Sequence, residues 1–151
     1  MRSLIYGYGD TGKSFERYLK DKKIDFDIFD SNIAEHNQNY NLEDFDQILC
    51  SPGVPKDIFE NIKSQNINTF TDVDIFFNED KSVKIGITGT NRKSTTAFHL
   101  HQLLNKYKPS NLVGNIGHTM LDFINNGKEF SIIELSSCLL YTSDAADDRN
   151  C

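Results

Sequence analysis

Three short stretches of this sequence carry residue types that phosphate chemistry uses. The first, GITGTNRKST at 86–95, places Lys93 and Ser94 at the start of a predicted helix. A lysine there supplies charge for the outer phosphates of a nucleotide, a serine hydroxyl can ligate Mg²⁺, and the helix start supplies free N–H groups. The strict phosphate-loop pattern has glycine where Ile87 and Arg92 stand, so the motif alone is weak. A helix capped by serine or threonine is the alternative.

The second stretch ends in a carboxylate, Glu134, at the end of an apolar strand predicted over 130–135. We expect this strand to lie beside the strand that precedes the 86–95 stretch. That pairing would place Glu134 near Ser94, as a second ligand of a magnesium ion. The alternative is a solvated glutamate at a strand end, and a lone glutamate usually has that role.

The third stretch, GYGDTGKS, has Gly7, Gly9 and Gly12 in the G-x-G-x-x-G spacing, after a predicted strand and before a predicted helix. In this pattern the first glycine permits a tight turn, the second lets a phosphate approach, and the third lets helix and strand pack closely. Asp30, at the end of the next strand, is placed to accept hydrogen bonds from ribose hydroxyls. The pattern indicates a nucleotide-like ligand, of which NAD is one candidate. A glycine turn that serves packing alone is the alternative.

Strands alternate with helices along the chain, which predicts an α/β fold with parallel sheets. Apolar runs predict strands at 4–6, 26–29, 45–50, 68–70, 83–87, 111–113 and 130–135. Apolar spacing predicts helices over 11–22, around 58–62, at 72–77 and over 93–107, the last with Ala97, Leu100, Leu104 and Tyr107 facing inward. Residues 31–44 show no period and are predicted as loop. The acids at 72–74 are interpreted as helix-start charges.

The pattern restarts near residue 82, so the sequence predicts two units. A Rossmann-like parallel-sheet domain over 1–81 is followed by the start of a phosphate-loop ATPase α/β domain over 82–137. The final segment, CLLYTSDAADDRNC at 138–151, lacks helical apolar spacing after Tyr141. We interpret it as a non-native tail from adaptor read-through, with a natural disordered tail as the alternative.

Composition limits the function classes. With 38% hydrophobic residues, 11 Phe and 6 Tyr, the 151-residue chain can build a core. A net charge of −6 argues against binding nucleic acid by neutralising its phosphates. No apolar run approaches the roughly 20 residues that span a bilayer, so no membrane insertion is expected. The three cysteines lack metal-site spacing, and a reducing cytoplasm is the simplest interpretation.

Taken in series, these motifs resemble the Mur ligase family. The resemblance spans almost all of residues 1–137 and rests on the following segments: Gly7–Gly12, Asp30, SPGV at 51–54, DVD at 72–74, 86–96, GNIG at 114–117 and ELSS at 134–137. SPGV together with ELSS favours the branch that adds D-glutamate to UDP-N-acetylmuramoyl-L-alanine. The alternatives are another Mur-type ligase, or a nucleotide-sensing module that binds a dinucleotide without catalysis.

The resemblance implies a monomeric, cytoplasmic, ATP- and Mg²⁺-dependent ligase of peptidoglycan synthesis, and hence of cell wall biogenesis, cell shape and cell division. It would activate a carboxylate as an acyl phosphate for attack by D-glutamate, with small-molecule substrates only. The implied ATP site is Gly89, Thr90, Asn91, Arg92, Lys93, Ser94 and Thr95. Lys93 and Glu134 would be catalytic, and Ser94 and Glu134 would hold Mg²⁺. The implied contacts to the UDP substrate are Asp10, Thr11, Asp30, Gly53 and Asn115.

The sequence departs from the family in two places. Arg92 stands where the family has glycine, a residue used where backbone passes close to phosphates or takes a positive φ. Its side chain either crowds the loop or adds a phosphate contact. Because Asn91, Lys93 and Ser94 are retained, we expect the loop still to bind ATP. The second departure is the 138–151 tail, which implies a fragment that lacks the D-glutamate site and is inactive alone.

Overall fold

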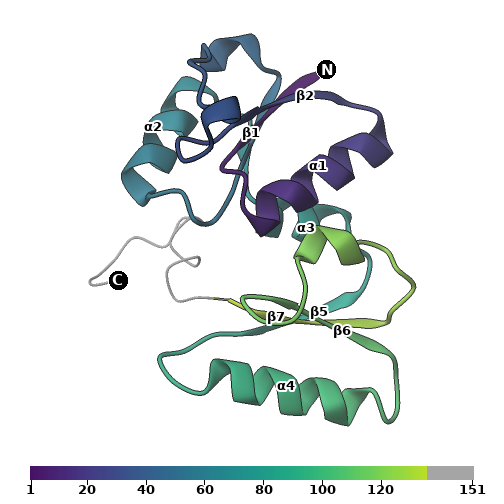
Figure 1. The fold of residues 1–151 in the computed structure, drawn as a ribbon. Helices are drawn as coiled ribbons and strands as arrows, with labels where there is room; N and C mark the ends of the chain where they lie inside the picture. Colours follow the sequence, from purple (N-terminus) through teal and green to yellow (C-terminus); the bar gives the residue numbers. More distant parts are fainter. Residues whose placement is uncertain (136–151) are drawn as a thin grey trace. The chain divides into compact units, whose positions relative to one another are not determined.

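The computed structural model describes residues 1–135, and the chain divides into two compact units, 1–78 and 79–151. Figure 1 shows both as α/β units with parallel strands. The sequence pattern predicts the boundary between residues 81 and 82. In the structure the second unit begins at Glu79, and within it the Ser82 N–H donates to the Asp80 carboxylate. The tail at 138–151 lies outside the described residues.

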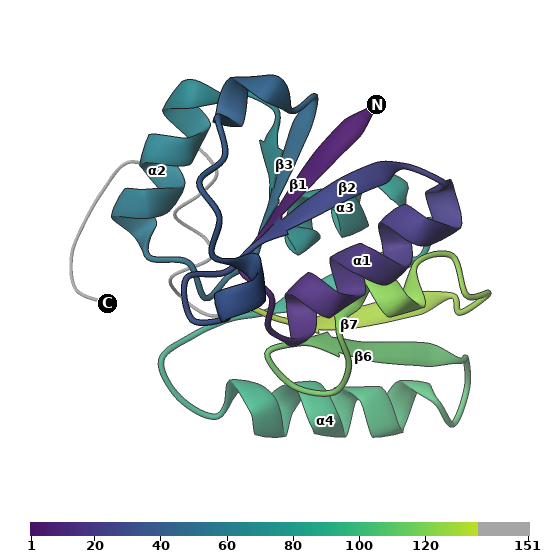
Figure 2. The ribbon, with the colours of Figure 1, turned by 45° about the horizontal axis from the view of Figure 1, so that its top comes forward.

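The first unit is a four-stranded parallel sheet in the order β2-β1-β3-β4. Its strands are β1 (Arg2–Tyr6), β2 (Asp25–Phe29), β3 (Gln47–Cys50) and β4 (Thr69–Phe70); its helices are α1 (Asp10–Lys22), α2 (Lys56–Gln65) and α3 (Asp72–Glu79). Single 3₁₀ turns at Ala34–His36 and Leu42–Asp44 interrupt the predicted loop. Helices α1 and α2 flank the strands on opposite sides (Figure 2).

The core of the first unit lies on both faces of this sheet, as expected for a parallel sheet covered by helices. On one face Leu4, Ile48 and Cys50 form a cluster with Ile62 of α2. The neighbouring strand residues Ile5 and Leu49 are also fully buried, and strand alternation points them to the other face. There α1, which packs against β1, β2 and β3, buries Phe15 and Leu19.

The second unit is a three-stranded parallel sheet in the order β5-β7-β6, packed against one long helix. Its elements are β5 (Val83–Ile87), α4 (Lys93–Leu104), β6 (Ser110–Gly114), a 3₁₀ turn at Met120–Phe123 and β7 (Phe130–Glu134). In the parallel register Glu134 pairs with Ile87 on one side and with Gly114 on the other. The predicted pairing of β7 with the strand before the phosphate motif is therefore confirmed.

Helix α4 ends earlier than its apolar spacing predicted. The helix stops at Leu104, and Tyr107, expected to face inward, is 80% exposed. The Lys108 N–H closes a tight turn on the Leu104 carbonyl at 2.7 Å. Pro109 follows, and the residue before a proline is disfavoured in helical conformation. The prediction for Tyr107 was wrong because its spacing continued past the point where the chain turns.

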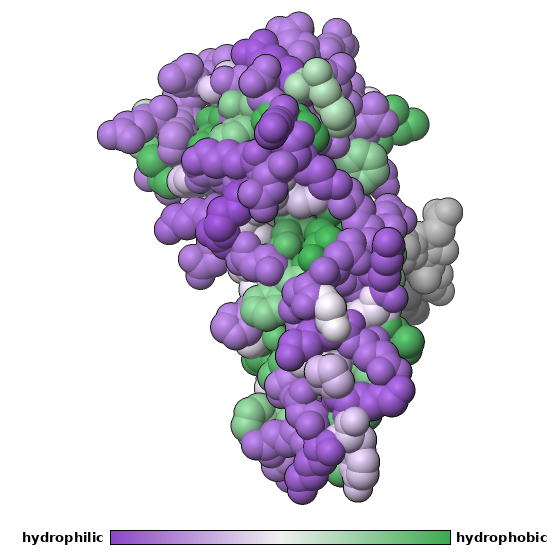
Figure 3. All heavy atoms as spheres, turned by 90° about the vertical axis from the view of Figure 1, so that its right-hand side faces the viewer, coloured by the Kyte–Doolittle hydropathy of each residue, from purple (hydrophilic) through white to green (hydrophobic). Residues whose placement is uncertain are grey.

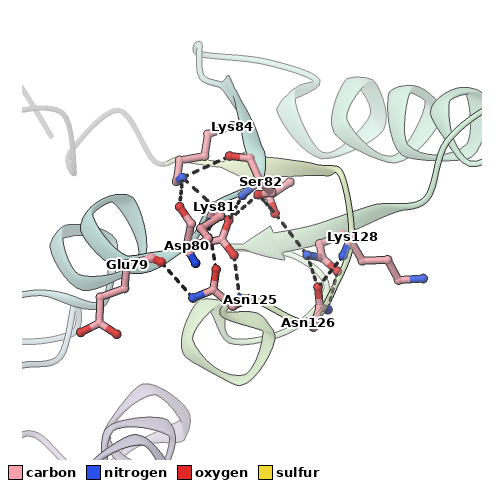
Figure 4. Close-up of polar contacts among 10 residues, drawn as sticks. Glu79, Asp80, Lys81, Ser82, Lys84, Asn125, Asn126 and Lys128 are labelled. Carbon is pink, nitrogen blue, oxygen red and sulfur yellow. Dashed lines mark hydrogen bonds and ion pairs between the residues drawn. The ribbon is translucent and has the colours of Figure 1, made fainter.

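A buried carboxylate, Asp80, organises the end of the second sheet where the strands begin (Figure 4). It accepts hydrogen bonds from the Asn125 N–H at 2.8 Å and the Ser82 N–H at 3.0 Å, and Lys84 lies 3.8 Å away. Burial acts to raise the pKa of Asp80, but the bonds from Ser82 and Asn125 and the charge of Lys84 hold it below its ordinary value. These contacts tie the start of the unit to the turn before β7.

Hydrophilic residues dominate the face of the molecule that Figure 3 shows, with apolar residues in smaller areas between them. Within residues 1–135, no helix has the length and apolar character needed to cross a membrane.

Candidate nucleotide sites

The loop of residues 88–92, called the phosphate loop below, joins β5 to the start of α4. No side chain caps α4 among the described residues, and its first backbone bond runs from the Thr96 N–H to the Arg92 carbonyl at 3.0 Å. The N–H groups of residues 93–95 therefore lack helical acceptors, as at any helix start. The Lys93 ammonium donates to the Gly89 carbonyl at 2.7 Å. An anion bound here would meet free N–H donors, the positive end of the helix dipole and one lysine.

Glu134 and Ser94 meet at this helix start, as predicted. The Ser94 hydroxyl donates to Glu134 Oε1 at 3.1 Å. Glu134 is only 4% exposed, which excludes the alternative of a solvated strand-end side chain. Its second oxygen, Oε2, is buried and has no hydrogen-bond partner among the described residues. A buried carboxylate oxygen without a donor is costly unless a ligand compensates it.

These two side chains fit a magnesium ion. Carboxylate and hydroxyl oxygens are the ligands Mg²⁺ prefers, and in nucleotide sites the ion keeps waters and binds phosphates beside one or two carboxylates. No cluster of three or more His, Cys, Asp or Glu side chains that could hold a metal occurs in residues 1–135. A site of one carboxylate, one hydroxyl and nucleotide phosphates needs no such cluster.

Arg92 takes the left-handed backbone conformation, with φ 57° and ψ 19°, immediately before α4. L-residues with a β-carbon disfavour this region, whereas glycine enters it freely. The geometry thus supplies a physical reason for a glycine at this position. The Arg92 side chain is exposed and forms no hydrogen bond or ion pair within the described part of the chain.

The segment after β6 folds back tightly beside Glu134. Gly114 has φ 105°, and a β-carbon there would lie 2.3 Å from the Glu134 carbonyl oxygen. Gly117 has φ 83°, and a β-carbon there would lie 2.3 Å from the Leu112 carbonyl oxygen. The exposed Asn115 between them donates its N–H to the Glu134 carbonyl at 3.1 Å. Lys93, Ser94, Asn115 and Glu134 therefore all lie at the carboxyl end of the second sheet.

In the first unit the three glycines of the glycine turn (residues 7–12) have distinct roles. Gly7 has φ 89°, and a β-carbon on Gly12 would lie 2.3 Å from the Gly7 carbonyl oxygen. Gly9 precedes α1 with no capping side chain, and a β-carbon there would meet no atom within 4 Å. Packing accounts for Gly7 and Gly12 but leaves the space above Gly9 open, as a diphosphate-binding turn requires.

Asp30 braces this turn. Its Oδ2 accepts the Tyr8 N–H at 2.7 Å and its Oδ1 accepts the Asn32 N–H at 2.8 Å. These backbone bonds, with Tyr8 the larger cause, hold the pKa of Asp30 below its ordinary value. Each carboxylate oxygen keeps further acceptor capacity for a ligand hydroxyl.

The other residues predicted for this site surround the same turn. Asp10 is exposed and Thr11 half-buried in the first turn of α1. Gly53 is exposed, and a β-carbon there would meet no atom within 4 Å. The loop that contains Gly53 is held against the glycine turn because the Ser51 hydroxyl donates to the Gly7 carbonyl at 2.6 Å. The carboxyl ends of β1, β2 and β3 thus bring the predicted residues together.

Sequence reasoning missed several contacts at these sites. The Tyr8 hydroxyl donates to Glu16, and the Tyr8 and His36 rings form a T-shaped contact with a centroid distance of 5.1 Å. The sequence signal that points to Glu16 is its i, i+4 spacing from Lys20, with which it forms an ion pair.

Asp72, which lies outside these sites, is in the first turn of α3 as expected, but it is 6% exposed and its Oδ1 has no partner among the described residues. Burial raises its pKa to about 6.

Comparison with known proteins gives the following similarities. No protein-family model matches the chain. The UDP-N-acetylmuramoylalanine--D-glutamate ligase of Francisella tularensis subsp. tularensis (strain WY96-3418) is 37% identical over 143 residues, which cover 89% of this chain and 33% of the relative. The protein of the same name from Thermosipho africanus (strain TCF52B) is 29% identical over 169 residues, covering 95% of this chain and 40% of the relative. The chain thus spans 33% to 40% of the length of these curated relatives. A solved structure, that of a pseudomurein peptide ligase type C from Methanothermus fervidus, aligns with a TM-score of 0.42 and 18% identity, covering 90% of this chain and 33% of that one.

Proposed function

Given that this chain belongs to the Mur ligase family, we propose that it forms the UDP-substrate unit and the ATP loop of an ATP-dependent ligase of peptidoglycan synthesis. The complete enzyme would add D-glutamate to UDP-N-acetylmuramoyl-L-alanine in the cytoplasm. The observation that carries the proposal is the hydroxyl of Ser94 bonded to the buried Glu134 carboxylate at the start of an uncapped helix. That combination offers donors for phosphates and oxygens for a cation at one place.

In the second unit, the residues of this chain would bind and orient the ATP phosphates. The N–H groups of residues 93–95 and the Lys93 ammonium would bind phosphate oxygens, with Lys93 giving up its bond to Gly89. Ser94 and Glu134 would hold Mg²⁺, which neutralises charge during phosphoryl transfer to the substrate carboxylate. Glu134 would thereby gain a partner for its buried Oε2. Transfer of the γ-phosphoryl group would release ADP and give an acyl phosphate, whose carbonyl carbon the amine of D-glutamate would attack with loss of inorganic phosphate.

In the first unit, the open space above Gly9 and the uncapped start of α1 would receive the diphosphate of the UDP substrate. Asp30 would accept from a ligand hydroxyl while its bonds to Tyr8 and Asn32 hold the turn. Asp10, Thr11 and Gly53 would complete the contacts around the turn. Asn115, which belongs to the second unit, is proposed as a further substrate contact.

The first test separates this proposal from a dinucleotide-binding module. Isothermal titration of the chain with UDP and with NAD should show binding of UDP and none of NAD. The variant Gly9→Ala should weaken UDP binding while lowering the free energy of unfolding by only about 1 kcal/mol or less, because its β-carbon enters empty space and only the N-cap preference for glycine is lost. The matched control Asn61→Ala, on the exposed side of α2, should change neither property. Tight NAD binding without a response to UDP would overturn the proposal.

The second test concerns ATP and magnesium. Ser94→Ala and Glu134→Gln should each reduce the Mg²⁺-dependent gain in ATP affinity by at least about tenfold. Binding measured without Mg²⁺ should change less. The control Gln102→Ala, exposed near the other end of α4, should behave as the parent chain does. A chain that binds ATP equally well with and without Mg²⁺ would contradict the assigned roles of Ser94 and Glu134.

A further inference from the structure

The phosphate loop ends in an arginine whose backbone geometry leaves the helix start intact. The Arg92 carbonyl accepts the Thr96 N–H at 3.0 Å, so α4 begins with a normal backbone bond although residue 92 is left-handed. The loop therefore tolerates a side chain at this position without losing the donors of the first turn. Arg92 occupies the N-cap position itself, directly before the free N–H groups of residues 93–95.

An arginine at an N-cap position acts differently from the usual capping residues. Serine, threonine or aspartate would accept a bond from one of these N–H groups and so occupy it. A guanidinium has donors only, so it leaves those N–H groups open and adds more donors beside them. The first turn of α4 carries no acidic residue that could pair with it. The loop thus presents donors that an anion would satisfy.

The charges around the loop favour the same ligand. The Lys93 ammonium is bonded to the Gly89 carbonyl, whereas Arg92 is exposed and has no partner among residues 1–135. Glu134, bonded to Ser94 at the same helix start, has a buried, unpartnered Oε2, which indicates a cationic ligand there. A magnesium-bound triphosphate supplies that cation and still carries net negative charge. Arg92, directly before Lys93, carries a positive charge that can offset this remaining negative charge of the triphosphate.

We propose that Arg92 is a second phosphate-binding cation of this site, whose guanidinium binds oxygens of the outer phosphates of a nucleoside triphosphate. A planar guanidinium matches two phosphate oxygens at once, which a lysine cannot do. Arg92 therefore strengthens triphosphate binding and contributes little to a nucleoside monophosphate. This inference rests on the proposed function, because it needs a nucleotide at the phosphate loop.

The test is equilibrium binding of ATP–Mg²⁺, ADP–Mg²⁺ and AMP to the full chain and to variants at this position. Arg92→Gln should bind ATP–Mg²⁺ about tenfold more weakly, the loss of one charge-assisted contact, with AMP binding nearly unchanged. Arg92→Lys should lose less, because it keeps the charge without the fork. Lys106→Gln removes the same charge from the exposed turn that follows the far end of α4 and should bind as the parent does. Circular dichroism of each variant checks that it is folded.

Arg92→Gly distinguishes a contact from an obstruction. Glycine suits φ 57° and removes the guanidinium together with any crowding, so the variant should be folded and yet bind ATP–Mg²⁺ more weakly than the parent. Tighter binding by Arg92→Gly, or unchanged binding by Arg92→Gln, would overturn the inference. If Ser94→Ala still abolishes the Mg²⁺ effect in that case, the proposed function stands and only the role of Arg92 fails. A parent chain that binds no ATP–Mg²⁺ overturns both.

Discussion

Single residues at these sites work against local preference, and a bound ligand would account for each departure. Arg92 adopts a left-handed conformation that costs an L-residue roughly 1–3 kcal/mol. Glu134 buries a carboxylate oxygen with no donor in the described part of the chain. Both residues flank the start of α4, where phosphates would bind. Backbone strain and buried polar groups without partners are concentrated at binding sites, because the bound ligand supplies the missing contacts.

Asp72 is a buried carboxyl group of the first unit, away from the glycine turn in sequence, and it links stability to pH. Burial raises its pKa from 3.8 to about 6, with the neighbouring charge of Asp74 acting in the same direction. The folded state therefore holds a proton between those values that the unfolded state has released. The stability contributed by protonated Asp72 is full below about pH 4 and is lost as the pH rises through about 6.

Replacing Asp72 by asparagine should remove this dependence. Between pH 4 and pH 7 the free energy of unfolding of the parent should fall by about 2–3 kcal/mol more than that of Asp72→Asn, since one pKa unit corresponds to about 1.4 kcal/mol. Urea unfolding followed by circular dichroism at several pH values measures the difference. Asp57→Asn, exposed in the first turn of α2, is the control and should keep the parent's profile. Parallel profiles for the parent and Asp72→Asn would show that the buried carboxyl carries no such linkage.

At the scale of elements, the approach of α1 to the end of β1 depends on one glycine. A β-carbon on Gly12 would lie 2.3 Å from the Gly7 carbonyl oxygen, which is backbone and cannot rotate away. Gly12→Ala should therefore displace α1 and lower the free energy of unfolding by about 2–3 kcal/mol. Gly9→Ala, three residues earlier, should lower it by only about 1 kcal/mol or less, because its β-carbon meets no atom within 4 Å and only the N-cap preference for glycine over alanine is lost.

Thermal and urea unfolding of the two glycine variants provide the comparison. Equal stability for both would mean that α1 can shift at little cost, and the packing role of Gly12 would be wrong. A large loss for Gly9→Ala would mean instead that the open space above the turn is needed by the fold itself, which would weaken the case for a diphosphate there.

Local sequence patterns predicted most elements of this fold, because apolar alternation and spacing are local properties. The strands follow from such patterns, and the expected pairing of β7 with β5 places Glu134 beside the end of β5, where the loop to α4 brings Ser94. The end of α4 was not predictable from spacing, since a proline turn overrides a period that continues by chance to Tyr107. The burial of Asp72 and the left-handed backbone of Arg92 depend on tertiary packing. The sequence therefore gave no indication that Asp72 is buried. For position 92 it offered a positive φ as only one of two reasons for a glycine.

Over the whole molecule, the two proposed sites lie in units of different charge. Acidic side chains clearly outnumber basic ones in residues 1–78, whereas the two kinds are equal in number in residues 79–151. A diphosphate at the glycine turn would be bound by backbone N–H groups within an acidic unit. A triphosphate at the phosphate loop would be bound with the help of Lys93 and Arg92. Salt should therefore lower the affinity for the triphosphate without lowering the affinity for UDP.

Raising NaCl from about 0.05 M to about 0.5 M shortens the distance over which exposed charges act from roughly 14 Å to about 4 Å. This screens the repulsion between UDP and the acidic first unit, so UDP affinity should stay constant or rise. The same change screens the attraction between ATP–Mg²⁺ and the cations of the phosphate loop, so ATP affinity should fall, and it should fall less steeply in Arg92→Gln. Titrations of both ligands on one preparation of the chain measure the two slopes side by side. If UDP affinity falls with salt as steeply as ATP affinity, exposed cations rather than backbone N–H groups bind the UDP phosphates, and the assignment of the diphosphate to the start of α1 would be wrong.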